Sequence, residues 1–571
     1  MQTALKNAKL YLILGILFNL ALLGFFKYTD FLLENFNLFS QLLHLDFNIP
    51  LPHILLPLGL SFVTFQQIAF LVDCYKRIDI SNMQEAYDIK SKERDFQIKQ
   101  YSYIKDNDEN KMRAKKVQQH KIEANGDRDS KNSYKSKENN FYKDYIDIYT
   151  QSHIKQDLHI KSKIDFIDYA LFVSFFPQLI AGPIVHHKEM MSQFGALKNN
   201  SYIKWDYIAK GLFIFSIGLF KKVFIADSFA KWANAGFGVV ENGGVLNIFE
   251  SWVTSLSYTF QLYFDFSGYC DMAIGLGLFF GIMLPINFNS PYKALNISEF
   301  WRKWHITLGR FLKEYVYIPL GGNRNTKYKD YSHYGILNKL LTLRNLFIIA
   351  LLSGIWHGAG YGFAIWGLLH GIAMIIHRIY SWVIDNMMHE RDSKSFLNTN
   401  LNNALESKDE KDSKDIDFKD LDSKSKADST KQLRNTPLAK NIRNFTQGRF
   451  YKVLCWFITF NFINIAWIFF RSENVQGAFN LLKGMFGIIW VELPLKAHHM
   501  PKLLGQIGGR NDTLVYIILA FVVCVWCRSA TTKLSQHINS ITFTILGAVF
   551  AYIVLGLFVQ DYNVPFLYFN F

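Results

Sequence analysis

Long apolar stretches alternate with polar segments along this chain. A membrane-spanning helix needs about 20 apolar residues to cross the hydrocarbon core of a bilayer, and most of these stretches approach that length. Several contain Gly, Pro or a charge, so the pattern predicts about nine to eleven transmembrane or re-entrant helices. The stretches lie near residues 10–26, 54–74, 166–184, 211–226, 250–284, 339–356, 361–377, 452–470, 513–527 and 541–560. The predicted fold class is an all-α polytopic membrane protein.

Two strongly polar tracts divide this membrane protein into segments. Residues 78–164 and 391–446 are rich in charged residues and poor in Leu and Val, so neither tract can bury a core. We predict that the first is a disordered cytoplasmic insertion and the second a low-complexity insertion. The membrane parts are then the N-terminal helices at 1–77, a core at 165–390 and the C-terminal helices at 447–571.

Composition and charge agree with a membrane location. Half of the 571 residues are apolar and 16% are aromatic, and the formal net charge is +15. The positive charge is spread over loops and tracts and forms no basic face with stacking aromatics, which argues against nucleic-acid binding. In a membrane protein, excess Lys and Arg mark cytoplasmic loops and contacts with anionic lipid. No cleavage site follows the first apolar run, so we interpret it as a transmembrane helix.

The segment FWRKWHITLGRFLKEYVYIPLGGNR, at 300–324, combines aromatic residues and cations around one histidine. Its spacing predicts a single short helix at the membrane interface, which ends at Pro319 and Gly321-Gly322. An ordinary basic interfacial helix explains most of these residues. His305 is the exception, because it belongs neither to the basic rim nor to an exposed turn. The apolar face consists of Trp301, Trp304, Leu308, Phe311, Leu312 and Tyr315.

A second histidine, His357, lies in the segment LSGIWHGAGYGFAIWG at 352–367. Ionisable side chains at membrane depth are costly and usually functional. The surrounding glycines allow close approach of another helix or of a thin substrate. A neutral imidazole is a natural base for taking a proton from a hydroxyl group. A packed histidine that bonds a backbone carbonyl explains the position equally well, and for His370 and His377 this structural interpretation is preferred.

Other polar residues in apolar surroundings give weaker signals. Asp265 and Asp271 are too costly to leave unpaired in lipid, so we expect them to face a protein interior or a wet cavity. Adjacent histidines rarely bind one ion, so His186-His187 is interpreted as loop, and no metal site is predicted. The sequence contains no Walker loop, GxGxxG, HExxH or Gly-Asp-Ser block, which removes the usual signs of nucleotide and esterase chemistry.

Taken in order, these segments resemble the membrane-bound O-acyltransferase family, in its alginate and peptidoglycan O-acetyltransferase branch. The resemblance implies a ring of membrane helices around a central tunnel, with residues 165–390 as the catalytic core. It also implies a multi-pass protein of the bacterial inner membrane that O-acetylates an envelope polysaccharide. The matching segments are LGLSFVTFQQIAFLVDCYK (58–76), FFPQLIAGPIVHH (175–187), GLFKKVFIAD (218–227), residues 264–324, residues 352–371 and GLFVQDYNVPFLYFNF (556–571).

The same resemblance assigns roles to individual residues. His357 matches the catalytic histidine and His305 the second polar position of the family. Arg302 and Lys303 are candidates for binding the phosphates of the acyl donor where it enters from the cytoplasm. Charged side chains that face the lipid explain these two residues equally well. The candidates for lining the tunnel and the substrate site are Trp304, Trp356, Asp265, Asn287 and Asn289.

The resemblance also implies a donor and partners. The expected donor is acetyl-CoA from the cytoplasm, with no bound cofactor. Because the chain lacks an esterase-type block, we expect a periplasmic partner enzyme to complete the transfer to the polysaccharide.

Two alternatives and one departure from the family accompany this prediction. Transfer of D-alanine or another acyl group fits residues 264–324 less well. A proton-coupled transporter predicts inverted repeats, and the sequence shows none. Family members begin with further membrane helices before the segment that matches residues 8–76. We therefore expect a misassigned start, a truncation or a separate piece that supplies those helices.

Overall fold

Every regular element in the described part of this chain is a helix, which confirms the all-α class. The computed structural model describes residues 2–45, 47–80, 166–180, 182–199, 205–323, 335–406, 448–489, 503–527, 529, 531, 540–558 and 566–567. Almost all of the tract at 78–164 and most of the tract at 391–446 lie outside these residues, so the expectations for them remain predictions.

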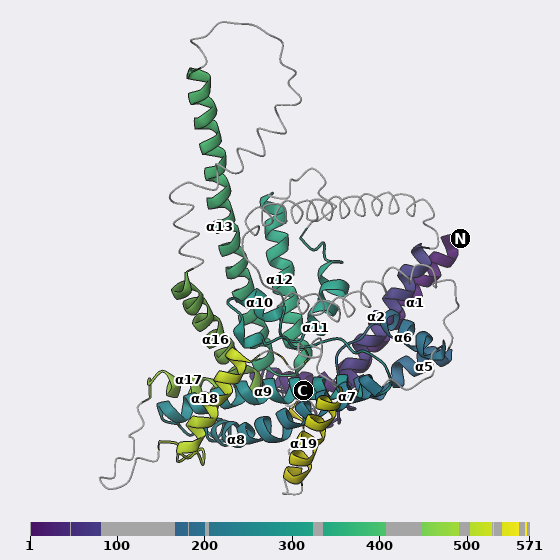
Figure 1. Ribbon diagram of the computed structural model, residues 1–571, viewed down its shortest axis with the longest axis vertical. Coiled ribbons are helices and arrows are strands. Elements are labelled where there is room, and N and C mark those ends of the chain that lie inside the picture. Colours follow the sequence, from purple (N-terminus) through teal and green to yellow (C-terminus); the bar gives the residue numbers. More distant parts are fainter. Residues whose placement is uncertain are drawn as a thin grey trace, which may run out of the picture.

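The helices follow the apolar stretches closely but not everywhere (Figure 1). In chain order they are α1 (Gln2–Leu42), α2 (Leu60–Ile80), α5 (Phe166–Ser174), η1 (Phe176–Gln178), α6 (His187–Asn199), α7 (Trp205–Phe220), η2 (Lys221–Ala226), α8 (Asp227–Glu241), α9 (Ile248–Phe279), η3 (Pro291–Lys293), α10 (Ile297–Trp301), α11 (Ile306–Leu312), η4 (Lys313–Tyr317), α12 (Ile336–His357), α13 (Tyr361–Glu406), α16 (Arg449–Arg471), α17 (Val475–Met485), α18 (Asn511–Trp526) and α19 (Ser540–Phe558).

Four of the described helices are long and apolar enough to cross a membrane, namely α1, α12, α13 and α16. Helices α18 and α19 contain shorter apolar segments. Many apolar side chains of α1, α18 and α19 are exposed, as expected for surfaces that face lipid. The chain is therefore a multi-pass membrane protein.

Helix α9 is the centre of the fold. A capping box of Asn247 and Glu250 begins it, and most of its residues are buried. Helices α7 and α8 pack along it in the lower part of Figure 1. Glycines allow α7 to approach closely, because a Cβ atom at Gly211 would lie 2.7 Å from the carbonyl oxygen of Gly275. The stretch predicted at 250–284 is thus a helix enclosed by others.

Helices α12 and α13 run side by side and hold the second histidine segment (Figure 1). At their contact, a Cβ atom at Gly354 would lie 2.8 Å from the Cα atom of Gly367, so the pair depends on small residues. Helix α12 ends at His357, and Gly358 is extended. The chain reverses at this point, and His357 therefore lies at a helix end.

Three sequence predictions differ from the structure. The stretch at 166–184 is not one span, because α5 ends at Ser174 and the separate short turn η1, which contains Pro177, follows it. Helix α13 continues to Glu406, across the expected boundary at residue 391, and no Pro or Gly interrupts it there. The single helix predicted over 300–324 is broken between α10 and α11, for reasons given below.

Candidate active site

The last residue of α12, His357, is buried inside an aromatic cluster. Its ring centroid lies 4.8 Å from that of Trp356, 5.4 Å from that of Trp366 and 5.1 Å from that of Phe470. Trp366 belongs to α13 and Phe470 to α16, so three membrane helices enclose this imidazole. The helix end determines where the side chain emerges, and the aromatic rings keep bulk water away from it.

The second histidine, His305, lies at the position where the predicted helix is broken. Its backbone has a φ of 43°, in the left-handed region, between α10 and α11. The preceding segment holds this geometry, because Asn289 N donates to the Lys303 carbonyl and Ile306 N donates to the Asn287 carbonyl, each at 2.9 Å. Long-range hydrogen bonds therefore override the local helical pattern and turn His305 inward.

One side chain, Asn287, fixes the tautomer of His305. The amide oxygen of Asn287 accepts the backbone N–H of Thr307 at 3.2 Å and its hydroxyl at 2.9 Å, which identifies this atom as the oxygen. Nδ1 of His305 lies 3.1 Å from the same oxygen. An amide oxygen only accepts, so Nδ1 carries the hydrogen and Nε2 holds the lone pair. Asn287 thus orients His305 as second-layer residues orient other functional histidines.

A line of tryptophans joins the two histidine segments. The Trp304 and Trp467 centroids are 5.0 Å apart, and Trp467 stacks on Trp366 at 5.5 Å. Trp366 in turn contacts His357. The structure therefore brings together five of the predicted residues: His357, His305, Trp304, Trp356 and Asn287.

Two further predicted lining residues, Asp265 and Asn289, have other roles in the structure. The Asp265 carboxylate is 2.9 Å from Nζ of Lys222 and accepts the backbone N–H of Leu567 at 3.1 Å. It belongs to a buried ion-pair cluster, which gives it the partner that its burial requires. Asp271 is paired in the same way with Lys221, at 2.6 Å. Asn289 contributes its backbone N–H to the loop around His305, as described above.

The two predicted donor-binding cations differ in their surroundings. Arg302 is exposed, whereas Lys303 forms an ion pair with Glu299 at 2.7 Å. Burial alone would raise the pKa of the Glu299 carboxyl, but hydrogen bonds from Lys303 and from the Leu295 backbone outweigh burial and lower it. Glu299 is therefore a stable carboxylate that offsets the charge of Lys303. Of the two cations, Arg302 is therefore the better candidate for binding the phosphate groups of an acyl donor.

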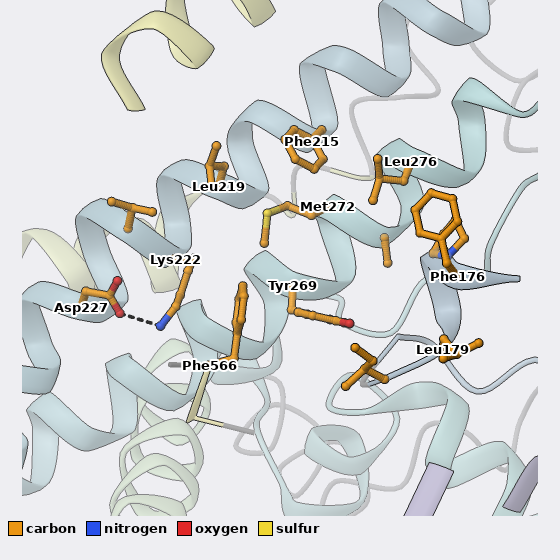
Figure 2. Close-up of a pocket in the computed structure, with 14 residues that line it drawn as sticks. Phe176, Leu179, Phe215, Leu219, Lys222, Asp227, Tyr269, Met272, Leu276 and Phe566 are labelled. Atoms are coloured by element: carbon orange, nitrogen blue, oxygen red, sulfur yellow. Dashed lines mark hydrogen bonds and ion pairs between the residues drawn. The ribbon is translucent and has the colours of Figure 1, made fainter. Parts of the chain in front are cut away.

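A cavity of about 430 Å³ lies on another side of α9 (Figure 2). Its wall is mostly apolar, and the ion pair of Lys222 and Asp227 stands at one end, next to Phe566. Neither His305 nor His357 lines it. This cavity is thus separate from the histidine site.

Several residues of the site could not be singled out from sequence. Trp366, Trp467 and Phe470 occur in apolar helices, where an aromatic residue of a functional site has the same pattern as one of the core. His370, interpreted as structural, is fully buried, and its Nδ1 accepts Nε1–H of Trp301 at 3.3 Å. This hydrogen bond ties α13 to α10, next to the break at His305.

Unused hydrogen-bond donors surround His357. Within the described residues, Nε1 of Trp356, Nε1 of Trp366 and Nε2 of His370 are buried and have no hydrogen-bond partner. Unpaired buried donors are costly, so each of them needs an explanation. Donors aimed at a reacting group are one such explanation, because they stabilise negative charge that develops on an oxygen. The described part of the chain holds no group of three or more His, Cys, Asp or Glu residues placed for a metal.

A multi-pass helical protein with two buried imidazoles fits a membrane-embedded acyltransferase. The sequence matches the membrane-bound O-acyltransferase family over residues 42–403, and the chain belongs to that family. It is an O-acyltransferase.

Curated relatives indicate which branch of the family this chain resembles. A peptidoglycan O-acetyltransferase from Helicobacter pylori is 41% identical over 99% of this chain and 82% of the relative. A "probable alginate O-acetylase AlgI" from Pseudomonas aeruginosa is 30% identical over 90% of this chain and 67% of the relative. A teichoic acid D-alanyltransferase from Bacillus subtilis is 25% identical over 38% of this chain and 54% of the relative. The resemblance to the O-acetyltransferase branch is thereby confirmed.

The role of Asn287 leads to a first prediction. Replacing Asn287 with alanine removes the acceptor that orients His305, and we expect acyl transfer to fall about 10–100-fold, the usual effect of losing an orienting partner. The measurement is ester formation at matched protein levels. Asn289→Ala is the matched control, because only the backbone of Asn289 holds the loop. Equal losses in both variants would contradict a specific role for Asn287.

Proposed function

We propose that this protein O-acetylates a cell-envelope polysaccharide, with peptidoglycan preferred over an alginate-like exopolysaccharide. The observation that carries the proposal is the enclosed pair of His357 and His305, in a chain that resembles peptidoglycan and alginate O-acetyltransferases. Peptidoglycan is preferred because that relative is more similar to this chain, over almost its whole length.

The proposed reaction transfers an acetyl group from a thioester to a hydroxyl. His357 takes the proton of the acceptor hydroxyl, whose oxygen attacks the thioester carbonyl carbon. Trp356 and Trp366 carry buried N–H groups that are available to the carbonyl oxygen as it becomes negative. When the carbon–sulfur bond breaks, the thiolate leaves and takes up a proton, and the new oxygen–carbon bond is the ester. His305 orients the donor, because its Nε2 holds a lone pair that accepts a hydrogen bond from an N–H group of the donor.

The donor and its entry are part of the same proposal. Acetyl-CoA is a thioester with several phosphate charges, and an exposed guanidinium such as Arg302 binds phosphate well. The acetyl group then moves through a tunnel within a ring of about nine to eleven transmembrane or re-entrant helices, of which a spanning one needs about 20 residues. In this arrangement the protein lies in the bacterial inner membrane.

A partner protein completes the reaction in this proposal. The chain has no Gly-Asp-Ser block of the esterase type, so a periplasmic enzyme accepts the acetyl group and passes it to the polysaccharide. D-alanyl transfer is the second candidate, but that relative is less similar and covers a smaller part of this chain.

The proposal is tested by measuring alkali-labile acetate on purified peptidoglycan and, separately, on extracellular polysaccharide. We expect deletion of the gene to remove acetate from peptidoglycan and the intact gene to restore it. Loss from the extracellular polymer alone would shift the acceptor to that polymer. Unchanged acetate on both polymers, with D-alanine lost from another envelope polymer, would contradict acetyl transfer and favour the second candidate.

A further inference from the structure

The C-terminal end of α12 needs hydrogen-bond donors from outside the helix. An α-helix leaves its last carbonyl groups without partners of its own, and in an apolar environment each unpaired carbonyl is costly. Helix α12 ends at His357, and the extended Gly358 begins no further helical turn. The carbonyls of Ile355, Trp356 and His357 are therefore the groups that another element must satisfy.

Helix α1 supplies these donors. Nζ of Lys27 donates to the carbonyl oxygens of Trp356 at 2.7 Å and of His357 at 2.8 Å. The hydroxyl of the next residue, Tyr28, donates to the carbonyl of Ile355 at 2.6 Å. The Lys27 ammonium also lies 5.9 Å from the centroid of the Trp356 ring. Two consecutive residues of α1 thus bind three consecutive carbonyls at the end of α12.

Placing the charged side chain of Lys27 in an apolar helix costs free energy, and this cost indicates a functional role. Lys27 lies within the apolar span Asn7–Leu42, where a charged side chain is expensive. Among the described residues no carboxylate forms an ion pair with it, and the carbonyls of α12 are its compensation. A cation at a helix C-terminus is favourable, because it faces the negative end of the helix dipole. These bonds are charge-assisted and stronger than those of a neutral donor.

We propose that Lys27 and Tyr28 are positioning residues that hold the His357 backbone, and through it the imidazole, in place for acyl transfer. This inference rests on the proposed function and deepens it. Lys27 contacts the backbone of the catalytic residue, so it is not itself a catalytic residue. The last turn of α12 sets the direction of the His357 side chain, and Gly358 gives that turn no helical continuation. A displacement of about 1 Å at a reacting group can cost about 10²-fold in rate.

The test compares variants of the full-length protein at matched levels in the membrane. Lys27→Met keeps a long unbranched side chain but removes its donors, and we expect the rate of ester formation to fall about 10–100-fold. Lys27→Arg restores charged donors and should recover most of the activity. Tyr28→Phe removes one neutral hydrogen bond and should lower the rate about 2- to 10-fold. Lys9→Met, on the exposed part of α1, is the matched control and should be unchanged.

Further measurements separate positioning from general stability and from the proposed function. In isolated membranes supplied with acetyl-CoA, Lys27→Met should lower the maximal rate and leave the half-saturating concentration nearly unchanged. If Lys27→Met does not accumulate, Tyr28→Phe and Lys27→Arg carry the test, and a wild-type rate in Tyr28→Phe overturns the inference. If His357→Ala is inactive while Lys27→Met keeps the wild-type rate, the inference is wrong and the proposed function stands. Full activity of His357→Ala would instead overturn the catalytic assignment.

Discussion

Replacing His357 with alanine is expected to lower acetyl transfer about 10²–10⁴-fold, the usual contribution of a general base. The imidazole is enclosed by Trp356, Trp366 and Phe470, so water has little access to replace it as a base. The measurement is alkali-labile acetate on the acceptor polymer in the deletion strain that carries the variant gene. Protein level in the membrane is measured in parallel.

His377→Ala is the control for this prediction. His377 is also a histidine of an apolar helix, but it is half-buried and lies on α13 beyond the aromatic cluster. It should retain full transfer. Wild-type transfer by His357→Ala at normal protein levels would contradict the role of His357 as the base. Loss in both variants would indicate a general sensitivity of the membrane helices.

Replacing Lys222 with methionine is expected to destabilise the protein by about 3–5 kcal/mol, because it leaves buried charges without compensation. Lys222 is the shared partner of two buried carboxylates, at 2.6 Å from Asp227 and 2.9 Å from Asp265. It also lies 4.9 Å from the centroid of the Phe566 ring, so the C-terminal segment packs on the same charge. The expected result is a lower melting temperature in detergent and less protein in the membrane.

Two further variants test the reason for this loss. Neutralising the whole cluster, with Asp227→Asn and Asp265→Asn added to Lys222→Met, should recover much of the stability, because uncompensated charge is removed. Arg510→Met is the surface control, since Arg510 and Asp512, its partner at 4.0 Å, are 84% and 57% exposed, and such pairs contribute about 0–1 kcal/mol. A triple variant as unstable as Lys222→Met would contradict the electrostatic explanation.

The sequence alone was sufficient for properties that depend on local composition. A stretch of apolar residues long enough for a bilayer identifies α12, α13 and α16 without any tertiary contact. His305 and His357 also stand out locally, as ionisable residues beside tryptophans in segments that resemble the acetyltransferase branch. The fold class, the family and the two candidate histidines were therefore predictable.

The other features of the fold and the site depend on segments that are far apart in the sequence but adjacent in the structure. The helical period of residues 300–324 gave no sign of the break at His305, because the hydrogen bonds that hold it are made with the preceding segment, at Asn287 and Asn289. Asp265 was grouped with the lining residues, and only the structure pairs it with Lys222.

At His357 the sequence and the tertiary structure each determined a different feature. The sequence by itself determined that a histidine lies at the end of an apolar, glycine-rich segment. Only the tertiary structure showed that Lys27, 329 residues away from Trp356, binds the end of that helix. The physical reason is that hydropathy and helix length are summed over neighbouring residues, whereas a hydrogen bond between helices depends on how distant segments pack.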